Sequence, residues 1–387
     1  MQNILLSFYL ALKEVWRNRG RFLLVSLVIA LITLLVLFIA ALGEGLGSNN
    51  KEYISKVDGQ LFVFLEKADN IISASRLDQN TLRAVRRVPG VADAGPLSVS
   101  TTAIVLSDNK ELKVSMLGVE SEHPAAPPIL TGRTFLTEQA REVVVDQRVL
   151  QRSNIKLGDT ISIRSTQGTK DQFFDLKVVG TTSGQAYLFQ PSIFLPSNVW
   201  EKIRPKSESE INNLTPAINV IVVKLRDPSK IKEMSQYIQE NVLNVNVTDI
   251  QTTINNIPGY TAQQGTVQTQ GFFTLLIGVL VIGGFFQIQI LQKVPQLGVL
   301  KAIGASNFLV GFASIIQITV VTAIGVGIGG LMTYLFSLGF PPTIPLTFNG
   351  SASLFAILAL LSIGPLGGLV SVVYAVKIEP LKALRLS

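Results

Sequence analysis

Four long runs without a charged side chain constrain this chain more than any other feature. The first run, Phe22–Leu42, has 21 residues and would form a helix about 31 Å long, which matches the hydrocarbon core of a bilayer. It is too long for the apolar core of a cleaved signal peptide, and it lacks a clean small-residue cleavage site. Together with the three later runs, it predicts transmembrane helices at 22–42, 271–291, 307–338 and 354–376.

Charged residues are concentrated between the first and second of these runs. Residues 1–42 and 271–387 contain 9 Lys or Arg and 2 Asp or Glu, whereas residues 43–270 contain 24 of each kind, so the net charge of +7 lies in the apolar ends. This distribution predicts a polytopic α-helical membrane protein with four transmembrane helices and a large extracytoplasmic α+β domain between the first and second. It excludes a soluble enzyme or a disordered chain. Basic residues that flank apolar runs indicate the lipid bilayer, and not nucleic acid, as a partner.

The basic residues near the ends of the runs predict the orientation, because Lys and Arg accumulate in cytoplasmic segments. With four spans, three basic clusters fall on one side of the membrane. These are Lys13, Arg17, Arg19 and Arg21 before the first run, Lys293 and Lys301 between the second and third, and Lys377, Lys382 and Arg385 after the fourth. Both termini, the loop 292–306 and the tail 377–387 are therefore expected in the cytoplasm. Residues 43–270 and the loop 339–353 are expected outside.

The segment that precedes the first span, 1–21, has apolar residues at helical spacing. They are Ile4, Leu5, Phe8, Leu12 and Val15. Trp16 and the basic cluster follow them, which is typical of an amphipathic helix that lies in the cytoplasmic interface with Trp16 at the depth of the headgroups. The alternative is that this segment simply continues the first span.

The insert 43–270 alternates strand signals with helix signals. The expected strands are rich in β-branched and aromatic residues, and they are Leu61–Leu65, Glu142–Val145, Thr160–Arg164, Phe173–Val179 and Asn219–Leu225. Asp78 and Asp227 each precede apolar residues at helical spacing, so both are expected to cap helices. The Gln- and Thr-rich stretch Thr261–Gln270 is expected to be a connector that leads back into the membrane. The pattern indicates an α+β domain of two subdomains.

Residues for catalysis and for common metal sites are missing from the sequence. The chain has no Cys and a single His, His123, which excludes Cys/His zinc sites, thiol nucleophiles and a His-based triad. No Gly-Lys pair is present, so there is no P-loop. We therefore expect a non-catalytic chain with no metal and no cofactor of its own.

One glycine motif inside the third run has a misleading form. Residues 325–330 match the dinucleotide pattern G-x-G-x-x-G, but they lie in an uncharged apolar run that no suitably spaced acidic residue follows. Gly325, Gly329 and Gly330 instead predict close packing of helices, including a contact between two copies of the chain.

The spans contain no Asp, Glu, Lys, Arg or His. Ion-coupled carriers usually place ionisable groups at this depth, so secondary transport is not expected. Gln287, Gln289 and Gln317 are the main large polar residues in the spans, and we expect them to satisfy one another across helices. The energy for any transport should then come from another subunit.

Two short stretches resemble a known family. Lys293-Val-Pro-Gln-Leu-Gly-Val-Leu-Lys301-Ala-Ile-Gly304-Ala305-Ser306 is similar to the R-x-x-E-I-G-x-x-R-A-x-G-A pattern of MacB/FtsX-type (type VII) ABC permeases, a group that includes LolC/LolE and DevC. The tail Ile378-Glu-Pro380-Leu-Lys-Ala383-Leu384-Arg385 resembles that group's D-P-x-x-A-L-R ending. Segments of the insert also follow the order seen in MacB-type periplasmic domains, and they are Leu130–Phe135, Val143–Asp146, Leu157–Asp159 and Val178–Gly180.

The resemblance implies a permease subunit of an ATP-driven exporter or extractor in a bacterial plasma membrane. A separate ATPase, in two copies, would bind ATP and Mg²⁺, and the permease would form a homodimer or a heterodimer with a similar chain, with or without a membrane-fusion adaptor. Hydrolysis would move the extracytoplasmic domain (mechanotransmission) and export a lipid, lipoprotein, peptide or drug. The alternatives are an FtsX-like transmitter that activates an extracellular cell-wall hydrolase without cargo, and a membrane-anchored enzyme.

The segment 292–306 would then couple the two proteins, through a short helix that starts at Pro295 and ends near Gly304. The residues expected to contact the ATPase are Lys293, Gln296, Leu297, Gly298, Leu300, Lys301, Ala302, Gly304 and Ala305. Gln296 replaces the family's Glu, and Lys replaces both of its Arg, so this contact must depend on hydrogen bonds and packing. The alternative is that Lys293 and Lys301 anchor the loop to anionic lipid. Pro380, Ala383, Leu384 and Arg385 are the motif residues of the tail.

Overall fold

The computed structural model describes residues 2–106, 110–212, 218–340, 346–348 and 350–377. The chain forms two compact units. We call residues 1–46 with 264–387 the membrane unit, and residues 47–263 the soluble unit. The tail motif Pro380, Ala383, Leu384 and Arg385 lies outside the described residues.

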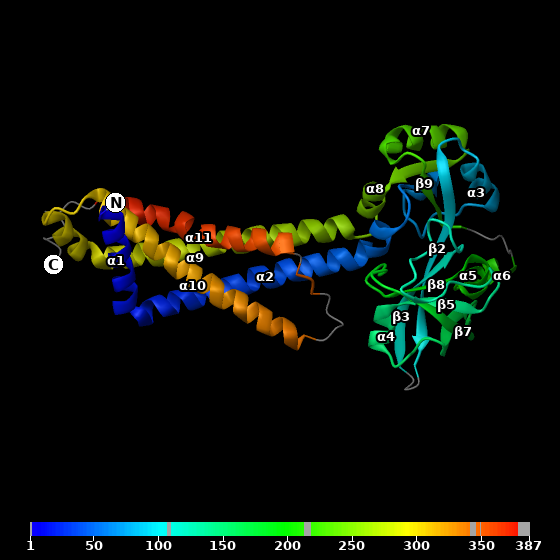
Figure 1. Ribbon diagram of the computed structural model, residues 1–387, viewed down its shortest axis with the longest axis horizontal. Helices are drawn as coiled ribbons and strands as arrows, with labels where there is room; N and C mark the ends of the chain where they lie inside the picture. Colours follow the sequence, from blue (N-terminus) through cyan, green and yellow to red (C-terminus); the bar gives the residue numbers. More distant parts are fainter. Residues whose placement is uncertain (1, 107–109, 213–217, 341–345, 349, 378–387) are drawn as a thin grey trace. The chain divides into compact units, whose positions relative to one another are not determined.

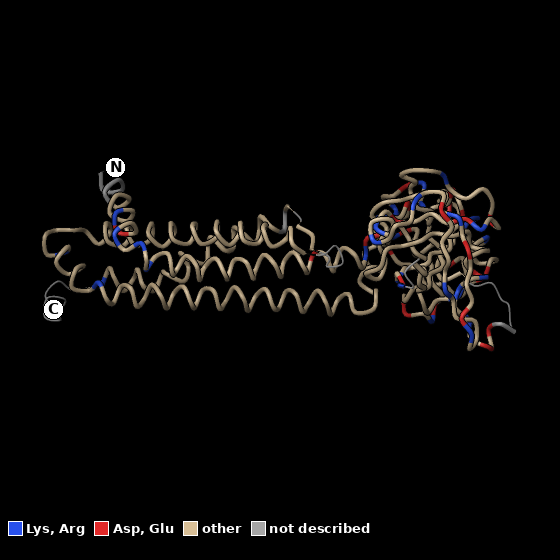
Figure 2. Tube along the Cα trace, turned by 90° about the horizontal axis from the view of Figure 1, so that it is seen from below, with Lys and Arg blue, Asp and Glu red and all other residues tan. Residues whose placement is uncertain are grey.

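Four helices in the described part of the chain are long and apolar enough to cross a membrane. They are α2 (Arg19–Lys56), α9 (Tyr260–Ala302), α10 (Asn307–Gly339) and α11 (Gly350–Lys377). Within the membrane unit they run along one another (Figure 1), and few charged residues interrupt them (Figure 2). The predicted number of spans is confirmed. Both α2 and α9 continue past the uncharged runs, and Thr261–Gln270 is helical, so the expectation of a connector there was wrong.

The N-terminal segment is a separate helix. α1 (Gln2–Arg17) ends at Asn18, whose carbonyl accepts bonds from the amides of Arg21 and Phe22 in the first turn of α2. α1 crosses one end of the bundle (Figure 1) and packs against α10. It buries Ser7 and Ala11 and leaves Trp16 exposed. Of the two interpretations of this segment, a continuation of the first span is therefore wrong.

Glycines set the distances between the spans. A Cβ at Gly325 would lie 2.6 Å from the Cβ of Ile29, and one at Gly329 would lie 2.5 Å from the carbonyl oxygen of Ala30, both on α2. A Cβ at Gly330 would meet nothing within 4 Å. Gly325 and Gly329 thus serve packing within one chain. The predicted close packing of helices is therefore seen between α10 and α2 of one chain, and the contact between two copies stays a prediction.

The glutamines of the spans do not satisfy one another as expected. Among the described residues, Gln287 Oε1, Gln289 Nε2 and Gln317 Nε2 are buried atoms without a hydrogen-bond partner. Gln289 lies on α9 and Gln317 on α10. The spacing of polar residues predicted that they enter the bundle, but it could not give their mutual geometry.

One ten-stranded sheet is the frame of the soluble unit. Its path is β10-β1-β9-β2-β3-β8-β5-β7-β4, with β6 paired to β2 and β7. The bounds are β1 Leu61–Leu65, β2 Val91–Val105, β3 Glu111–Val119, β4 Thr131–Gly132, β5 Glu142–Asp146, β6 Thr160–Gln167, β7 Lys170–Thr182, β8 Ser192–Pro196, β9 Val220–Leu225 and β10 Val245–Asp249. The five predicted strands are confirmed as β1, β5, β6, β7 and β9.

Short helices cover the sheet. They are η1 (Glu66–Ala68), α3 (Gln79–Arg86), α4 (Gln147–Arg152), α5 (Ser197–Ile203), α6 (Glu208–Asn212), η2 (Pro228–Lys230), α7 (Ile231–Asn241) and α8 (Ile250–Asn255). The predicted caps are confirmed, since Asp78 accepts a bond from the Thr81 amide and Asp227 accepts one from the Ser229 amide. One apolar cluster packs α3 and α7 on β1, β9 and β10, and another packs α4 and α5 on β3 and β5–β8. The long strand β2 passes through both regions (Figure 1).

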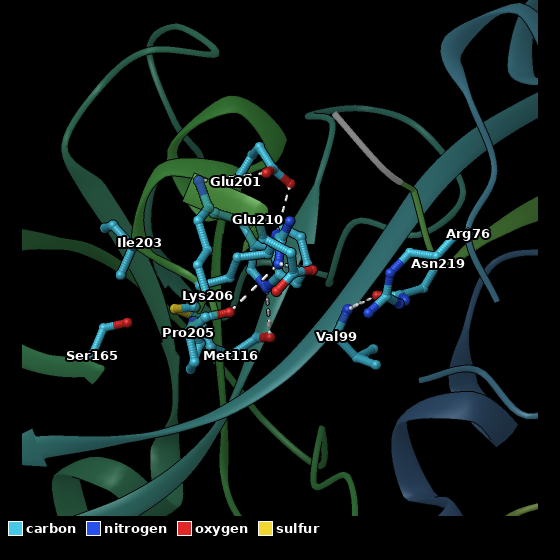
Figure 3. A network of polar contacts seen from close by, with 12 residues as sticks. Arg76, Val99, Met116, Ser165, Glu201, Ile203, Pro205, Lys206, Glu210 and Asn219 are labelled. Carbon is cyan, nitrogen blue, oxygen red and sulfur yellow. Dashed lines mark hydrogen bonds and ion pairs between the residues drawn. The ribbon is translucent and has the colours of Figure 1, made fainter. Parts of the chain in front are cut away.

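Polar side chains also hold this sheet together from inside (Figure 3). The Asn219 carboxamide accepts a bond from the Val99 amide at 2.7 Å and donates to the Ser75 carbonyl at 2.9 Å. The Trp200 indole donates to the Met116 carbonyl, and the guanidinium of Arg204 pairs with Glu201. Because these groups satisfy one another, this network stabilises the fold and offers no free reactive atom.

Candidate functional site: the α9–α10 turn and the anchored helix ends

The helix that carries the predicted coupling segment is continuous. α9 runs from Tyr260 through Pro295 to Ala302, so the predicted start of a separate helix at Pro295 was wrong. A proline removes one backbone hydrogen bond, and packing on both sides of it can keep the helix intact. The predicted end near Gly304 agrees with the observed end of α9. Any displacement at Ala302 is therefore carried along a single element.

A tight turn joins α9 to α10. Gly304 has a φ of 102°, which only glycine adopts without strain, and the Ala305 amide closes the turn on the Leu300 carbonyl at 3.1 Å. Ser306 then caps α10 by accepting a bond from the Leu309 amide. Only four residues, 303–306, connect one span to the next, and hydrogen bonds hold this short connection in a tight turn.

Several residues predicted to contact an ATPase make contacts inside the bundle. Leu297, Leu300 and Ala305 pack on a cluster of Ile290, Val310 and Ala375, and Gly298 is buried. Lys293 pairs with Glu14 on α1 and lies over the Phe22 ring. The ammonium of Lys301 donates to the Val376 carbonyl on α11. The two lysines therefore join α9 to its neighbours, which is a role that the motif did not reveal.

The outward face of the turn consists of other residues. Gln296, Ala302 and Gly304 from the predicted set are exposed. Val299 and Ile303, which sequence reasoning missed, are 48% and 77% exposed. Their signal was helical spacing: once Leu297, Leu300 and Lys301 face inward, positions 299 and 303 must face outward. We call Gln296, Val299, Ala302, Ile303 and Gly304 the coupling face.

At their other ends, both long helices are fixed into the soluble unit. Glu52 of α2 pairs with Arg148 at 2.6 Å and also accepts a bond from the Ala186 amide. The fully buried Tyr53 donates through its hydroxyl to the Ala125 carbonyl at 2.8 Å. Tyr260, the first residue of α9, is buried in the same core, and the Lys51 ammonium lies over its ring. These contacts attach the last turns of α2 and the first turn of α9 to the sheet.

Two family models together match most of the chain. The MacB-like periplasmic core domain matches residues 22–241, and the FtsX-like permease C-terminal domain matches residues 270–380. The first match alone covers more than half of the chain and contains the first span and most of the soluble unit.

The chain is also similar to individual proteins. The chain is 22% identical to a putative hemin transport system permease protein HrtB of Staphylococcus haemolyticus, over 97% of this chain and 98% of that one. It is 23% identical to an uncharacterized ABC transporter permease of Mycobacterium bovis, over 96% and 97% of the two chains. The periplasmic region of MacB from Actinobacillus actinomycetemcomitans superposes with a TM-score of 0.33 and 18% identity, over 54% of this chain and 98% of that one. The chain belongs to the MacB/FtsX family of ABC transporter permeases.

Proposed function

We propose that this chain is the permease subunit of an ATP-driven exporter or extractor, and that a separate ATPase drives it through the coupling face. The observation that carries the proposal is the continuity of α9 from the soluble unit to the α9–α10 turn. The chain has no P-loop, so energy from ATP must enter through a contact with another protein. ATP and Mg²⁺ would be bound by that partner, in two copies.

The coupling face has the properties that such a contact needs. Val299 and Ile303 supply exposed apolar surface, and Gln296 supplies hydrogen-bonding groups in place of a charge. Because the connection between α9 and α10 is only four residues long, a displacement of Ile303 by a bound partner would move both helices together. Lys301 and Lys293, which bind α11 and α1, would extend that motion to the rest of the bundle.

The fixed ends of α2 and α9 would transfer the motion to the outer side. Glu52, Tyr53 and Tyr260 attach these helices to the sheet through buried groups, so a shift of either helix should move the soluble unit as a body. In this mechanism the cargo is handled outside the membrane, and no wide pore is needed. Candidate cargoes are a lipid, a lipoprotein, a peptide, a drug, or an amphiphile such as the hemin for which one group of relatives is named. That name favours transport over signalling without cargo.

The test measures partner binding by the full chain. Ile303→Asp should reduce co-purification with the cognate ATPase by about tenfold or more, because it places a charge in an apolar contact. Coupled ATP hydrolysis in liposomes should fall in parallel. The matched control is Leu243→Asp, because Leu243 is 86% exposed but lies on the soluble unit. Normal binding and normal hydrolysis by the Ile303→Asp variant would show that the turn is not the coupling element.

A further inference from the structure

A cavity of about 590 Å³ lies inside the membrane unit, where α1, α9 and α10 meet. It is close to the α9–α10 turn but is distinct from the coupling face, since only Gln296 belongs to both. Its wall has charged residues from α1 and α9, three glutamines, two of them buried, and apolar side chains. Each of these three layers restricts what the cavity can bind.

The two buried glutamines, Gln289 and Gln317, form the layer of the wall that has unsatisfied hydrogen-bonding atoms. Gln289 is 4% exposed and Gln317 is 7% exposed, and both line the cavity. In the part of the chain that the structure describes, neither side-chain nitrogen has a hydrogen-bond partner. A buried donor without an acceptor costs free energy, and native proteins rarely leave two such donors in one place. A molecule that carries hydrogen-bond acceptors would satisfy both donors at once.

The charged residues of the wall determine which sign of charge the ligand should carry. Lys13 and Arg17 of α1 and Lys293 of α9 line the cavity, and among the described residues Glu14 is the one acidic residue of its wall. Glu14 pairs with Lys293, which leaves the cations of α1 in formal excess. An anionic group is therefore favoured at this level of the cavity.

The order of the layers gives the kind of molecule. Gln289 precedes Lys293 by about one helical turn, and Gln317 lies about 15 Å along α10 from its first residue, so both amides are deeper in the bundle than the charges. Phe286 and Ile318 add apolar wall beside them. A phospholipid has the same sequence of groups along its length: phosphate, ester carbonyls, then acyl chains.

We propose that this cavity binds one anionic phospholipid. Its phosphate lies near Lys13 and Arg17, and its ester carbonyl oxygens accept hydrogen bonds from Gln289 and Gln317. The bound lipid joins α1 to α9 and α10, beside the Lys293–Glu14 pair. It is a fixed component of the permease, and its binding does not depend on the ATPase.

The test counts lipids on the purified chain. Protein is equilibrated with mixed phosphatidylglycerol and phosphatidylcholine micelles, delipidated, and examined by native mass spectrometry. One phosphatidylglycerol should remain on each parent chain. The double variant Gln289→Leu/Gln317→Leu should retain it about tenfold more weakly. The matched control is Gln287→Leu, because Gln287 is a neighbouring intramembrane glutamine that does not line the cavity, and it should retain the lipid.

The heat stability of each variant shows whether a loss of bound lipid is caused by a loss of the fold. Without lipid, the double leucine variant should be at least as heat-stable as the parent, since it removes two unsatisfied donors. A second variant, Lys13→Glu/Arg17→Glu, should abolish the preference for phosphatidylglycerol over phosphatidylcholine, and it decides the matter if the leucine variant does not fold. Equal retention by the parent and the double leucine variant would overturn the proposal. So would equal retention of the two lipids by the parent, or displacement of the lipid by millimolar inorganic phosphate, which would identify a free-anion site.

Discussion

Arg133 and Glu142 form a two-point ion pair at the edge of the sheet. The guanidinium donates to both carboxylate oxygens, and the Leu136 amide donates to one of them at 3.0 Å. The pKa of the Glu142 carboxyl is lower than its ordinary value, mainly because Arg133 donates hydrogen bonds to the ionised form. Beside the pair, Gly132 has a φ of 84°, and a Cβ there would lie 2.3 Å from the Val179 carbonyl oxygen. Only glycine allows this approach of the two strands.

The lowered pKa of Glu142 predicts a pH dependence of stability. The unfolded chain binds the proton of this carboxyl at a higher pH than the folded chain does. The stabilisation is therefore complete above the ordinary pKa and is lost as the pH falls through the folded value. Glu142→Gln should lower the thermal unfolding midpoint of the purified chain at pH 7, and the difference from the parent should shrink near pH 3.

The control for this comparison is Glu111→Gln. Glu111 pairs with Arg164 at 2.9 Å, but both side chains are exposed, and exposed pairs contribute little to stability. A difference between parent and Glu142→Gln that stays constant with pH would contradict the assignment of the effect to the ionised pair.

At the scale of elements, helix packing in the membrane unit depends on which glycine faces a neighbour. Gly329 faces α2, whereas the adjacent Gly330 faces open space. Gly283 of α9 and Gly367 of α11 approach each other in the same way, since a Cβ on Gly283 would lie 2.7 Å from the Gly367 carbonyl oxygen. Packing is the main attraction between helices in lipid, so these contacts set the arrangement of the spans.

This contrast gives a paired prediction. Gly329→Leu should destabilise the bundle by about 1–3 kcal/mol, because the side chain must displace the backbone of Ala30 or the side chain of Thr33. Gly330→Leu adds the same group to the same helix and should leave stability nearly unchanged. The measurement is the thermal unfolding midpoint of each variant in detergent. If both variants behave alike, the α2–α10 contact is not close-packed in solution.

The pattern of apolar residues along the sequence predicted the elements in which these residues recur regularly or in which a capping residue marks the first turn. The four spans, the five strands and the two Asp caps belong to this group. β2 was missed because Gly95 and Pro96 within it are typical of a turn, and β10 because Val245–Asp249 is short and half polar. The length of α9 was missed because Gln and Thr are common in loops, and pattern alone does not show that the helix continues as far as Tyr260.

The candidate site was predicted only as a segment. A motif assigns residues to a segment, but it does not state which face of a helix is already covered. Leu297, Leu300 and Lys301 of the motif fix the turn to the bundle, and our proposal gives the partner-facing role to the exposed residues between them. Buried amides such as Gln289 could be listed from sequence, but their lack of partners depends on three helices and could not be predicted.

At the scale of the whole molecule, the two units have opposite compositions. The soluble unit contains most of the charged residues (Figure 2), and the membrane unit has exposed apolar surface on every long helix. Basic residues at the end of the bundle that contains α1 and the α9–α10 turn favour a cytoplasmic location for that end. The orientation with both termini inside is therefore our proposal for the chain in its membrane.

Cysteine labelling tests this orientation in a chain that has no cysteine of its own. Leu243→Cys and Ile303→Cys place thiols at sites that are 86% and 77% exposed, one in each unit. A membrane-impermeant maleimide should label Leu243→Cys in intact cells and should label Ile303→Cys only after the membrane is opened. If instead Ile303→Cys is labelled in intact cells and Leu243→Cys is not, the orientation is the opposite of our proposal. The α9–α10 turn could then not contact a cytoplasmic ATPase.

The place of β1 in the sheet has a consequence for how the protein is made. β1 lies between β9 and β10, so the strand Leu61–Leu65 finds its partners only when residues 220–249 have been synthesised. Until then β1 has no neighbouring strand, because this long-range pairing cannot begin earlier. The bundle closes later still, since Gly329 must be translated before α10 can meet Ala30. A chain truncated before residue 220 therefore lacks both partners of its first strand.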